Sequence, residues 1–232
     1  LSVQCVIKGI NLAMNKHIDA LVTAPICKEA ILLGGYGYPG HTEMLHTFSG
    51  VERVVMLMAG GKLRVAFATT HIAIKDVPQS ITPEGILGTI TICNEGLKQY
   101  YGLKRPRIAV CGLNPHAGEE GIFGDEERKV IVPAIEKARK KGIHCDGPVS
   151  ADTVFYKALK GAHDLVIAMY HDQGAIPLKL HAFETGVNIT LGIPFVRTSP
   201  DHGTAYDIAG KGIADPRSMM EAIKTAVKMA EV

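Results

Sequence analysis

The chain has 232 residues, a net charge of +2 and 47% hydrophobic residues. This composition is ordinary for a folded globular protein and excludes disordered, collagen-like and coiled-coil chains. The balanced charge, without a Lys/Arg tract, argues against nucleic acid as a partner, and no apolar run approaches the ~20 residues of a membrane-spanning helix. Five cysteines without a CxxC pair predict buried, reduced thiols in a cytoplasmic protein. The sequence begins at Leu1 in what resembles the middle of an amphipathic helix, so we expect an N-terminal segment to precede it.

Helical patterns alternate along the chain with short apolar runs bounded by turn residues. The predicted helices are Val3–Asn15, Lys28–Leu33, Glu43–Ser49, Pro83–Tyr101, Glu126–Lys141 and Ser218–Ala230. The predicted strands are Asp19–Thr23, Arg53–Met58, Leu63–Ala68, Arg107–Cys111, Asp164–Met169 and Val187–Leu191. Thr82 is predicted to cap the helix that begins at Pro83, and Asp125 to cap the helix after it. This alternation is typical of an α/β fold with a largely parallel sheet.

Three histidines come shortly after strand-like runs. The segments RVAFATTH, RIAVCGLNPH and DLVIAMYH end at His71, His116 and His171. Ligands of parallel α/β sheets bind beyond the carboxyl ends of the strands, so histidines from three such strands can converge on one divalent metal ion. Any one of them alone is more often a hydrogen-bonded loop residue. The shared position of all three favours a metal site.

A glycine-rich stretch, GGYGYPG, precedes His41 and Thr42. Its residues Gly35–Gly40 match G-x-G-x-x-G, but a dinucleotide fingerprint requires a preceding strand, and the pattern here is helical. We expect a loop leading to a helix N-terminus at Thr42, where backbone N–H groups can bind an anion. The alternative is that Thr42 only caps the helix.

Lys179, Asn188 and Arg197 recur at nine-residue intervals. A lysine, an amide and an arginine on consecutive loops and strand ends can clamp a phosphate or carboxylate, with the arginine binding bidentately. The alternative is a set of ordinary solvated side chains, since a regular interval does not by itself bring three side chains together.

Two acidic residues are candidates for proton transfer. Asp152 lies between small residues and an apolar run, so it is either a general base or a helix cap. Asp172 directly follows His171.

The segment SPDHGTAYDIAGKGIADPRSM is rich in small residues, Gly203 among them, that let a backbone approach a flat ligand closely. His202 can stack on an adenine, and Asp207 can accept a hydrogen bond from a ribose or adenine group. The alternative is a plain glycine-rich turn before the last helix.

This segment resembles the adenine-binding loop of isocitrate and isopropylmalate dehydrogenases. The stretches YPGHTE, TTHIA, GLNPHAGE, GDEE, ADTVF, MYHDQG and VNITLGIPFVRTSPDHGTA together resemble the 4-hydroxythreonine-4-phosphate dehydrogenase family, from about Asp19 to the C-terminus. The resemblance implies an isocitrate/isopropylmalate dehydrogenase-like α/β fold of two α/β/α subdomains with a cleft between them, in a homodimer with its active site at the subunit interface. We expect residues 1–33 and 187–232 to form the first subdomain and residues 34–186 the second.

The resemblance also implies roles for individual residues. One divalent cation (zinc, magnesium or cobalt) would be bound by three histidines, one of them from the partner subunit: His71, His116 and His171. The phosphorylated substrate would be bound by His41, Thr42, Lys179, Asn188 and Arg197. Proton transfer would fall to Asp152, Asp172 or Lys179. NAD or NADP would lie against His202, Gly203 and Asp207.

The implied reaction is the NAD(P)-dependent oxidation of 4-phosphooxy-L-threonine to 2-amino-3-oxo-4-phosphooxybutanoate. The product then loses carbon dioxide to give 3-amino-2-oxopropyl phosphate, in pyridoxal phosphate (pyridoxine) biosynthesis. GIFGDEE also resembles a sister group that acts on D-threonate or D-erythronate 4-phosphate. The histidines alone leave a zinc hydrolase as an alternative. A binding protein without turnover is another, because the family's opening strand and MGDPAGIGPE-like loop are not part of this sequence.

Overall fold

The computed structural model describes residues 1–38 and 40–232, so Pro39 of the glycine-rich stretch lies outside the described residues. The chain forms two compact units: unit 1 comprises Leu1–Val54 and Glu184–Val232, and unit 2 comprises Val55–Phe183. Residues 34–54 and 184–186 thus belong to unit 1, whereas the sequence placed them in the second subdomain. The reason is packing, because the helix at His41–Ser49 contacts the first helix and contributes Met44 and Leu45 to the unit 1 core.

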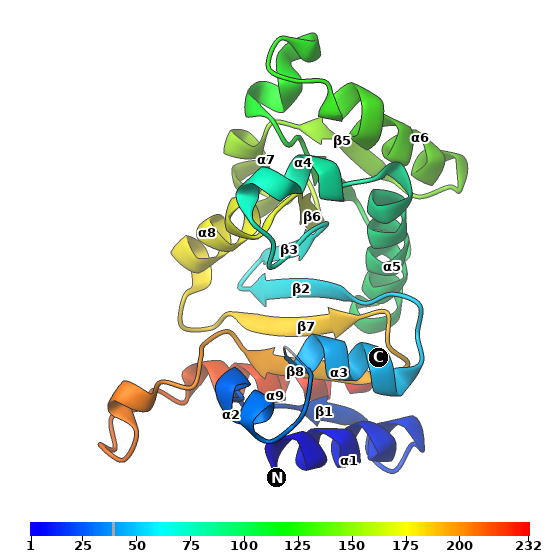
Figure 1. The fold of residues 1–232 in the computed structure, drawn as a ribbon. Coiled ribbons are helices and arrows are strands. Elements are labelled where there is room, and N and C mark those ends of the chain that lie inside the picture. Colours follow the sequence, from blue (N-terminus) through cyan, green and yellow to red (C-terminus); the bar gives the residue numbers. More distant parts are fainter. Residues whose placement is uncertain (39) are drawn as a thin grey trace. The chain divides into compact units, whose positions relative to one another are not determined.

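Unit 1 is a three-stranded sheet with helices on both faces. Its elements are α1 (Ser2–Met14), β1 (Ala20–Val22), α2 (Lys28–Leu33), α3 (His41–Ser49), β7 (Val187–Leu191), β8 (Val196–Pro200), the 3₁₀ turn η4 (Tyr206–Ile208) and α9 (Arg217–Ala230). Strand β8 lies between β1, to which it is parallel, and β7, to which it is antiparallel. Helix α9 packs against all three strands, and α1 packs against α3 and β1 (Figure 1).

Unit 2 is a five-stranded sheet, also covered on both faces. Its elements are β2 (Val55–Gly60), β3 (Leu63–Phe67), η1 (Ile74–Asp76), α4 (Val77–Ser80), α5 (Pro83–Tyr101), β4 (Ile108–Cys111), η2 (Pro115–Gly121), η3 (Glu127–Ile131), α6 (Val132–Lys140), β5 (Cys145–Val149), α7 (Ala151–Leu159), β6 (Leu165–Ala168) and α8 (His171–Ala182). The strand order is β2-β3-β6-β4-β5. Only the β2–β3 hairpin is antiparallel among these pairs of described strands. The α/β class and the largely parallel sheet are therefore confirmed.

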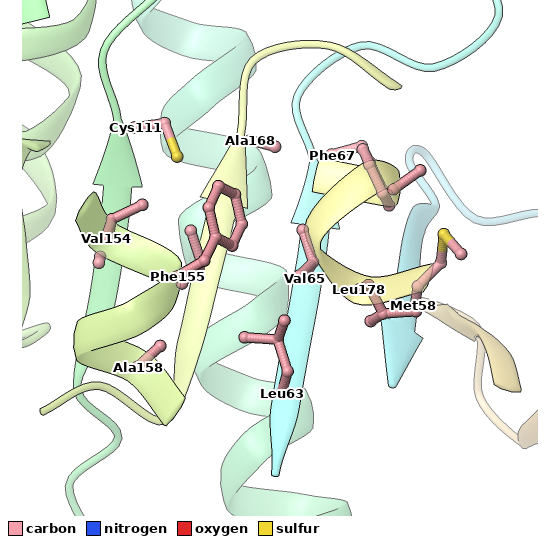
Figure 2. Packing of buried hydrophobic residues seen from close by; sticks show 13 residues of the cluster. Met58, Leu63, Val65, Phe67, Cys111, Val154, Phe155, Ala158, Ala168 and Leu178 are labelled. Carbon is pink, nitrogen blue, oxygen red and sulfur yellow. The ribbon is translucent and has the colours of Figure 1, made fainter. Parts of the chain in front are cut away.

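The core of unit 2 follows the alternation of its strands. Val65 and Phe67 point to one face of β3, where Leu178 of α8 and Phe155 of α7 cover them (Figure 2). Helix α5 lies behind the same strands in this view and packs against β2 and β3. Each buried side chain of this size stabilises the fold by about 1.5–3 kcal/mol relative to leaving it exposed. The well-packed sheet thus positions the loops and helices that follow its strands.

The predicted start of α5 is confirmed. Thr82 caps the helix, its hydroxyl accepting a hydrogen bond from Gly85 N over 3.0 Å, and Pro83 occupies the first position. The capping role predicted for Asp125 is wrong. Its carboxylate instead pairs with the flanking cations Arg128 and Lys129, at 2.5 and 2.8 Å.

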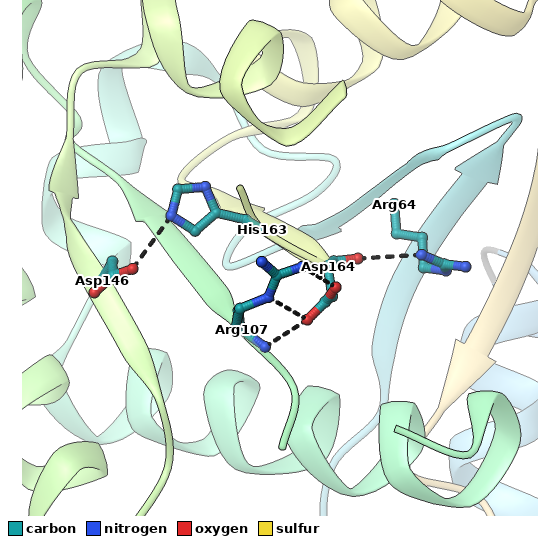
Figure 3. Close-up of polar contacts among 5 residues, drawn as sticks. All are labelled: Arg64, Arg107, Asp146, His163 and Asp164. Carbon is teal, nitrogen blue, oxygen red and sulfur yellow. Dashed lines mark hydrogen bonds and ion pairs between the residues drawn. The ribbon is translucent and has the colours of Figure 1, made fainter. Parts of the chain in front are cut away.

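At the amino ends of the parallel strands, ion pairs hold the chain in place (Figure 3). Asp164, just before β6, accepts two side-chain hydrogen bonds from Arg107, over 3.1 and 2.8 Å, and one from its backbone N–H. The same contacts lower the pKa of Asp164. Asp146 of β5 pairs with His163 at 3.2 Å. This edge therefore joins β4, β5 and β6, and it contains none of the predicted site residues.

All five cysteines are free, but their burial differs from the expectation. Cys93, Cys111 and Cys145 are buried, Cys27 is half-buried and Cys5 is exposed. Cys5 is exposed because it lies on α1 between the positions that face the core, Val3 and Val6. No helix among residues 1–38 and 40–232 is long and apolar enough to cross a membrane.

Candidate functional site

Four segments that carry predicted site residues leave the same edge of the unit 2 sheet. Strands β3, β6, β4 and β5 are parallel neighbours in that order. Their carboxyl ends therefore lie at one edge, and His71, His171, His116 and Asp152 follow them in the same order. The prediction that the three histidines follow three separate strands of a parallel sheet is confirmed, and the structure shows that these strands are neighbours.

His71 and His171 lie side by side at this edge, with ring centroids 5.6 Å apart. The ring of Phe67 stacks on His171 at 5.9 Å and 20°. Asp172 Oδ1 lies 2.7 Å from Nδ1 of His171. A carboxylate at Nδ1 fixes the tautomer and leaves Nε2 as the ligand atom, an arrangement common among metal-binding histidines. Both histidines line a cavity of about 270 Å³ together with Thr70, Tyr170 and Asp172.

Helix α8 is anchored so that His171, its first residue, lies at the sheet edge. Gln173 Oε1 accepts a hydrogen bond from Met169 N over 2.6 Å, and its Nε2 donates to Gly112 O over 2.8 Å. Gly174 brings the first turn of α8 against β3, since a Cβ at this position would lie 2.5 Å from Val65. Gln173 therefore ties the carboxyl end of β6 to that of β4.

His116 is exposed and lies in a separate loop after β4, where its ring contacts Phe123 at 6.4 Å. Within the described residues of this single chain, no group of three or more His, Cys, Asp or Glu side chains is placed to hold a metal ion. His71 and His171 nevertheless fit a metal, because they are neighbouring imidazoles, one of them oriented by a carboxylate. The structure thus brings together two of the three predicted ligands.

Asp152 and Lys179 are also in unit 2. Asp152 lies in the first turn of α7 and accepts a hydrogen bond from Ser150 Oγ over 2.6 Å. The N-cap is Ser150, so Asp152 is not the cap that the sequence favoured. Lys179 is half-buried on α8, about two turns after His171, and not in a loop or at a strand end.

Arg197 of β8 is the centre of a second site, in unit 1. Its side chain is 3% exposed, and burial lowers the pKa of its guanidinium to about 10. Nη1 donates to Thr190 Oγ1 over 3.1 Å and Nη2 to Thr23 Oγ1 over 2.6 Å, but Nε has no acceptor among the described residues. No described carboxylate pairs with it, so this buried cation is suited to bind an anion.

Two further predicted residues accompany Arg197. His41 is the first residue of α3, and its buried Nε2 has no partner within the described parts of the chain. Burial, and then the charge of Arg197, lower the pKa of His41 to about 4. Asn188 lies on β7 two residues before Thr190, and therefore on the same face of the strand.

Helix α3 begins two residues earlier than predicted, at His41 and not at Glu43. Gly40 is the N-cap, so Thr42 is the second helical residue and does not cap the helix. The preceding glycine-rich stretch follows helix α2, which supports the view that Gly35–Gly40 is not a dinucleotide fingerprint.

The glycine-rich segment near the C-terminus forms a third site, also in unit 1. His202, Gly203 and Tyr206 line a cavity of about 510 Å³, and Cys27 lines its other side. Asp207 is exposed in η4. A hydrogen bond from the backbone of Ala30, and then one from Tyr206, lower the pKa of the Cys27 thiol. The volume and the exposed small residues fit part of a nucleotide.

Sequence reasoning missed several residues that support these sites: Thr23, Glu127, Gln173 and Thr190. Thr23 is the last residue of the predicted strand Asp19–Thr23, so the sequence already indicated its position at a strand end. Glu127 and Gln173 lie in GDEE and MYHDQG, which are among the stretches that carry the family resemblance. Their roles depend on contacts with other parts of the chain, which neither stretch reveals by itself.

Comparisons with known proteins show which proteins this chain is similar to. The chain is 52% identical over 229 residues to 4-hydroxythreonine-4-phosphate dehydrogenase of Geobacter metallireducens, covering 99% of the chain and 67% of that protein. It is 50% identical over 224 residues to D-threonate 4-phosphate dehydrogenase of Cupriavidus necator, covering 96% of the chain and 67% of that protein. The chain thus spans about two thirds of the length of these curated relatives.

Solved structures give the same result. The crystal structure of 4-hydroxythreonine-4-phosphate dehydrogenase from Klebsiella pneumoniae matches with a TM-score of 0.93 and 45% identity, covering 99% of this chain and 69% of that one. Isocitrate dehydrogenase from Methylococcus capsulatus shares the fold alone, with a TM-score of 0.51 and 13% identity over 97% of this chain and 80% of that one. The family described as "Pyridoxal phosphate biosynthetic protein PdxA" matches residues 1–226. The chain therefore belongs to the PdxA family of pyridoxal phosphate biosynthetic proteins.

Proposed function

We propose that the protein is a metal- and NAD(P)-dependent dehydrogenase that oxidises 4-phosphooxy-L-threonine to 2-amino-3-oxo-4-phosphooxybutanoate. This β-keto acid then decarboxylates to 3-amino-2-oxopropyl phosphate. Membership of the PdxA family and the relatives named 4-hydroxythreonine-4-phosphate dehydrogenase support the reaction. The observation that carries it is the pair of adjacent imidazoles, His71 and His171, with Asp172 at Nδ1 of the second.

The site residues have separate tasks in this proposal. His71, His171 and His116 would hold a divalent cation, which would supply the Lewis acidity that lowers the pKa of an alcohol and polarises a neighbouring carbonyl. The cavity lined by His202 and Gly203 would hold NAD or NADP, which would supply the hydride acceptor. Adding zinc, magnesium or cobalt to the chelated protein and measuring which one restores turnover decides among the three cations.

Binding and proton transfer fall to the chain's own residues. Arg197, with His41 and Asn188, holds an anionic group of the substrate, because its buried charge has no carboxylate partner among the described residues. Thr42 and Lys179 are proposed to complete substrate binding. Proton transfer is assigned to Lys179, Asp172 or Asp152. Asp152 is exposed and lies at the same edge of the unit 2 sheet as His116.

A second copy of the chain is the proposed partner. Ile176, Leu180 and Phe183 are 57%, 84% and 76% exposed and recur at helical spacing along α8 and its end. An exposed apolar stripe of this kind is suited to cover a matching surface. Because α8 begins at His171, a subunit docked on it would reach the metal edge and provide the third histidine. Nucleic acid and membrane are not proposed as partners. The cysteine pattern supports a cytoplasmic location.

The test is NADH or NADPH formation, followed by absorbance, with 4-phosphooxy-L-threonine as substrate. We expect turnover that a chelator abolishes and added divalent metal restores. His171→Ala should lose at least 100-fold in kcat/KM, while His144→Ala, at an exposed histidine on the amino side of β5, should leave it unchanged. Metal-independent turnover, or none with either cofactor, would contradict the proposal.

D-Threonate 4-phosphate is the second candidate substrate, since D-threonate 4-phosphate dehydrogenase of Cupriavidus necator is almost as similar. It and D-erythronate 4-phosphate carry a hydroxyl in place of the amino group, and the metal and anion sites serve both classes equally. Comparing kcat/KM for the three substrates decides between them. A higher value for a sugar acid keeps the mechanism and changes the assigned substrate.

A further inference from the structure

The loop that carries His116 has an unusual backbone. Six consecutive residues have positive φ angles: His116 (52°), Ala117 (54°), Gly118 (81°), Glu119 (41°), Glu120 (56°) and Gly121 (101°). Residues other than glycine adopt this left-handed conformation at a cost of about 1–2 kcal/mol each. A run of this kind persists only where the surrounding structure holds it in place.

One buried side chain provides that support. Glu127, at the start of η3, is 5% exposed. Its Oε1 accepts hydrogen bonds from Leu113 N over 2.8 Å and Asn114 N over 2.7 Å. Its Oε2 accepts one from Asn114 Nδ2 over 3.0 Å. The carboxylate therefore binds the two residues at which the loop leaves β4.

The loop and this carboxylate are packed closely together. A Cβ at Gly118 would lie 2.6 Å from Glu127 Oε2, and one at Gly112 would lie 2.6 Å from Ala117 Cα. Glycine at both positions is what allows the loop to fold back over Glu127. The left-handed run thus packs against the Glu127 side chain at Gly118.

We propose that Glu127 is a positioning residue, which holds the loop Leu113–Gly121 in the conformation that presents His116 to the metal. This inference rests on the proposed role of His116 as a ligand. Glu127 acts through the backbone: its two oxygens are occupied by donors from Leu113 and Asn114, and its side chain is buried. A carboxylate is needed because both of its oxygens accept, whereas a glutamine amide offers one acceptor and a nitrogen that would oppose a donor.

The test compares Glu127→Gln with Glu126→Gln in zinc affinity, measured by competition with a chelating dye. Glu126 is half-buried and accepts from Asn114 Nδ2 over 2.7 Å, and its glutamine variant keeps an acceptor for that bond. We expect Glu127→Gln to bind zinc about 10- to 100-fold more weakly, as is usual when a supporting residue of a ligand is lost. Glu126→Gln should bind zinc like the wild type.

Hydrogen exchange separates positioning from general destabilisation. In Glu127→Gln the amides of Leu113 and Asn114 should exchange faster, while amides in the β3–β6 pairing keep their wild-type rates. Gly118→Ala, which leaves every charge in place but directs a Cβ at Glu127 Oε2, should reproduce both effects. It provides the test if Glu127→Gln fails to fold.

Unchanged zinc affinity in a folded Glu127→Gln or Gly118→Ala variant would overturn the inference. So would unchanged zinc affinity in His116→Ala, because the loop would then have no ligand to present. The proposed reaction is tested separately. Wild-type protein that binds zinc through His116 but forms no NADH or NADPH would refute the dehydrogenase reaction and leave the role of Glu127 intact.

Discussion

The hydroxyl of Thr69 donates a hydrogen bond to the carbonyl oxygen of Met169 over 2.6 Å, and the backbone N–H of Thr69 donates to the same oxygen over 3.2 Å. The pairing between β3 and β6 therefore continues past the last residues of both strands. His71 and His171 each follow two residues later, which explains why their rings lie side by side. Thr69 thus supports the edge of the sheet that carries the proposed metal ligands His71 and His171.

Replacing Thr69 with valine keeps the shape of the side chain and removes this side-chain bond. We expect zinc affinity to fall about tenfold and the free energy of unfolding to fall by about 0.5–1.5 kcal/mol. The control is Thr91→Val in α5, a helix that carries none of the three histidines. There the threonine hydroxyl donates a hydrogen bond to Leu87 O over 2.9 Å. The control should lose similar stability and no zinc affinity. Equal zinc affinity in the two variants would count against this role of Thr69.

Arg197 is expected to bind its ligand at the expense of stability. Its buried guanidinium has only hydroxyl partners among the described residues, so replacing it with methionine removes the cost of burying an unpaired charge and should raise the free energy of unfolding. The same variant should lose the rise in Tm that inorganic phosphate or the phosphorylated substrate gives the wild type. Arg105→Met, at an exposed arginine, serves as control. Phosphate that stabilises Arg197→Met as much as wild type would refute the anion site.

His41 makes stability depend on pH in a defined window. Its pKa is about 4 in the folded chain and 6.5 in the unfolded one. Between these values the unfolded chain binds the extra proton, so stability falls as the pH falls from about 6.5 to 4. His41→Asn should show a smaller loss over this range, as measured by urea unfolding at several pH values.

The same histidine reports on the anion. A phosphate bound beside Arg197 offsets the positive charge that disfavours the imidazolium, so the pKa of His41 should rise when phosphate is added. An NMR titration of the imidazole signals with and without phosphate measures this directly. A pKa of His41 that does not move would place the anion elsewhere.

Cys27 should be the most reactive thiol. Hydrogen bonds from Ala30 and Tyr206 lower its pKa, whereas burial raises the pKa of Cys111 and of Cys145 to about 12. Iodoacetamide at neutral pH should therefore modify Cys27 before Cys5, and the buried cysteines only after unfolding. Since Cys27 lines the cavity of His202 and Gly203, NAD or NADP should protect it and leave the labelling of Cys5 unchanged. Mass spectrometry of the labelled peptides gives the rates.

The sequence predicted most of the sheet, because its central strands are short apolar runs between turns. It did not predict β8, which ends at Pro200, or β5, which contains Gly147 and Pro148. Such residues are depleted in strands in general and are tolerated here because β5 lies at the end of the strand order in its unit. Helices α7 and α8 were not predicted either. Helix α8 contains Pro177, and tertiary packing outweighs its local cost.

The candidate site was predictable where a residue's place depends on strand direction alone. The three histidines were found because each follows a strand of the parallel part of the sheet. Arg197 was expected near a strand end, but it lies within β8 and is buried. One of its two hydrogen-bond partners is Thr23, which is 174 residues away in the sequence. No pattern read along the chain contains that information.

Unit 2 is one uninterrupted stretch, Val55–Phe183, whereas unit 1 is built from the segments on either side of it. In genetic terms, the stretch that carries the three histidines is contiguous, and the segments of unit 1 lie on either side of it. Two crossovers, one at each end of this stretch, would exchange the histidine-bearing residues as a single cassette and leave Arg197 and His41 in the recipient.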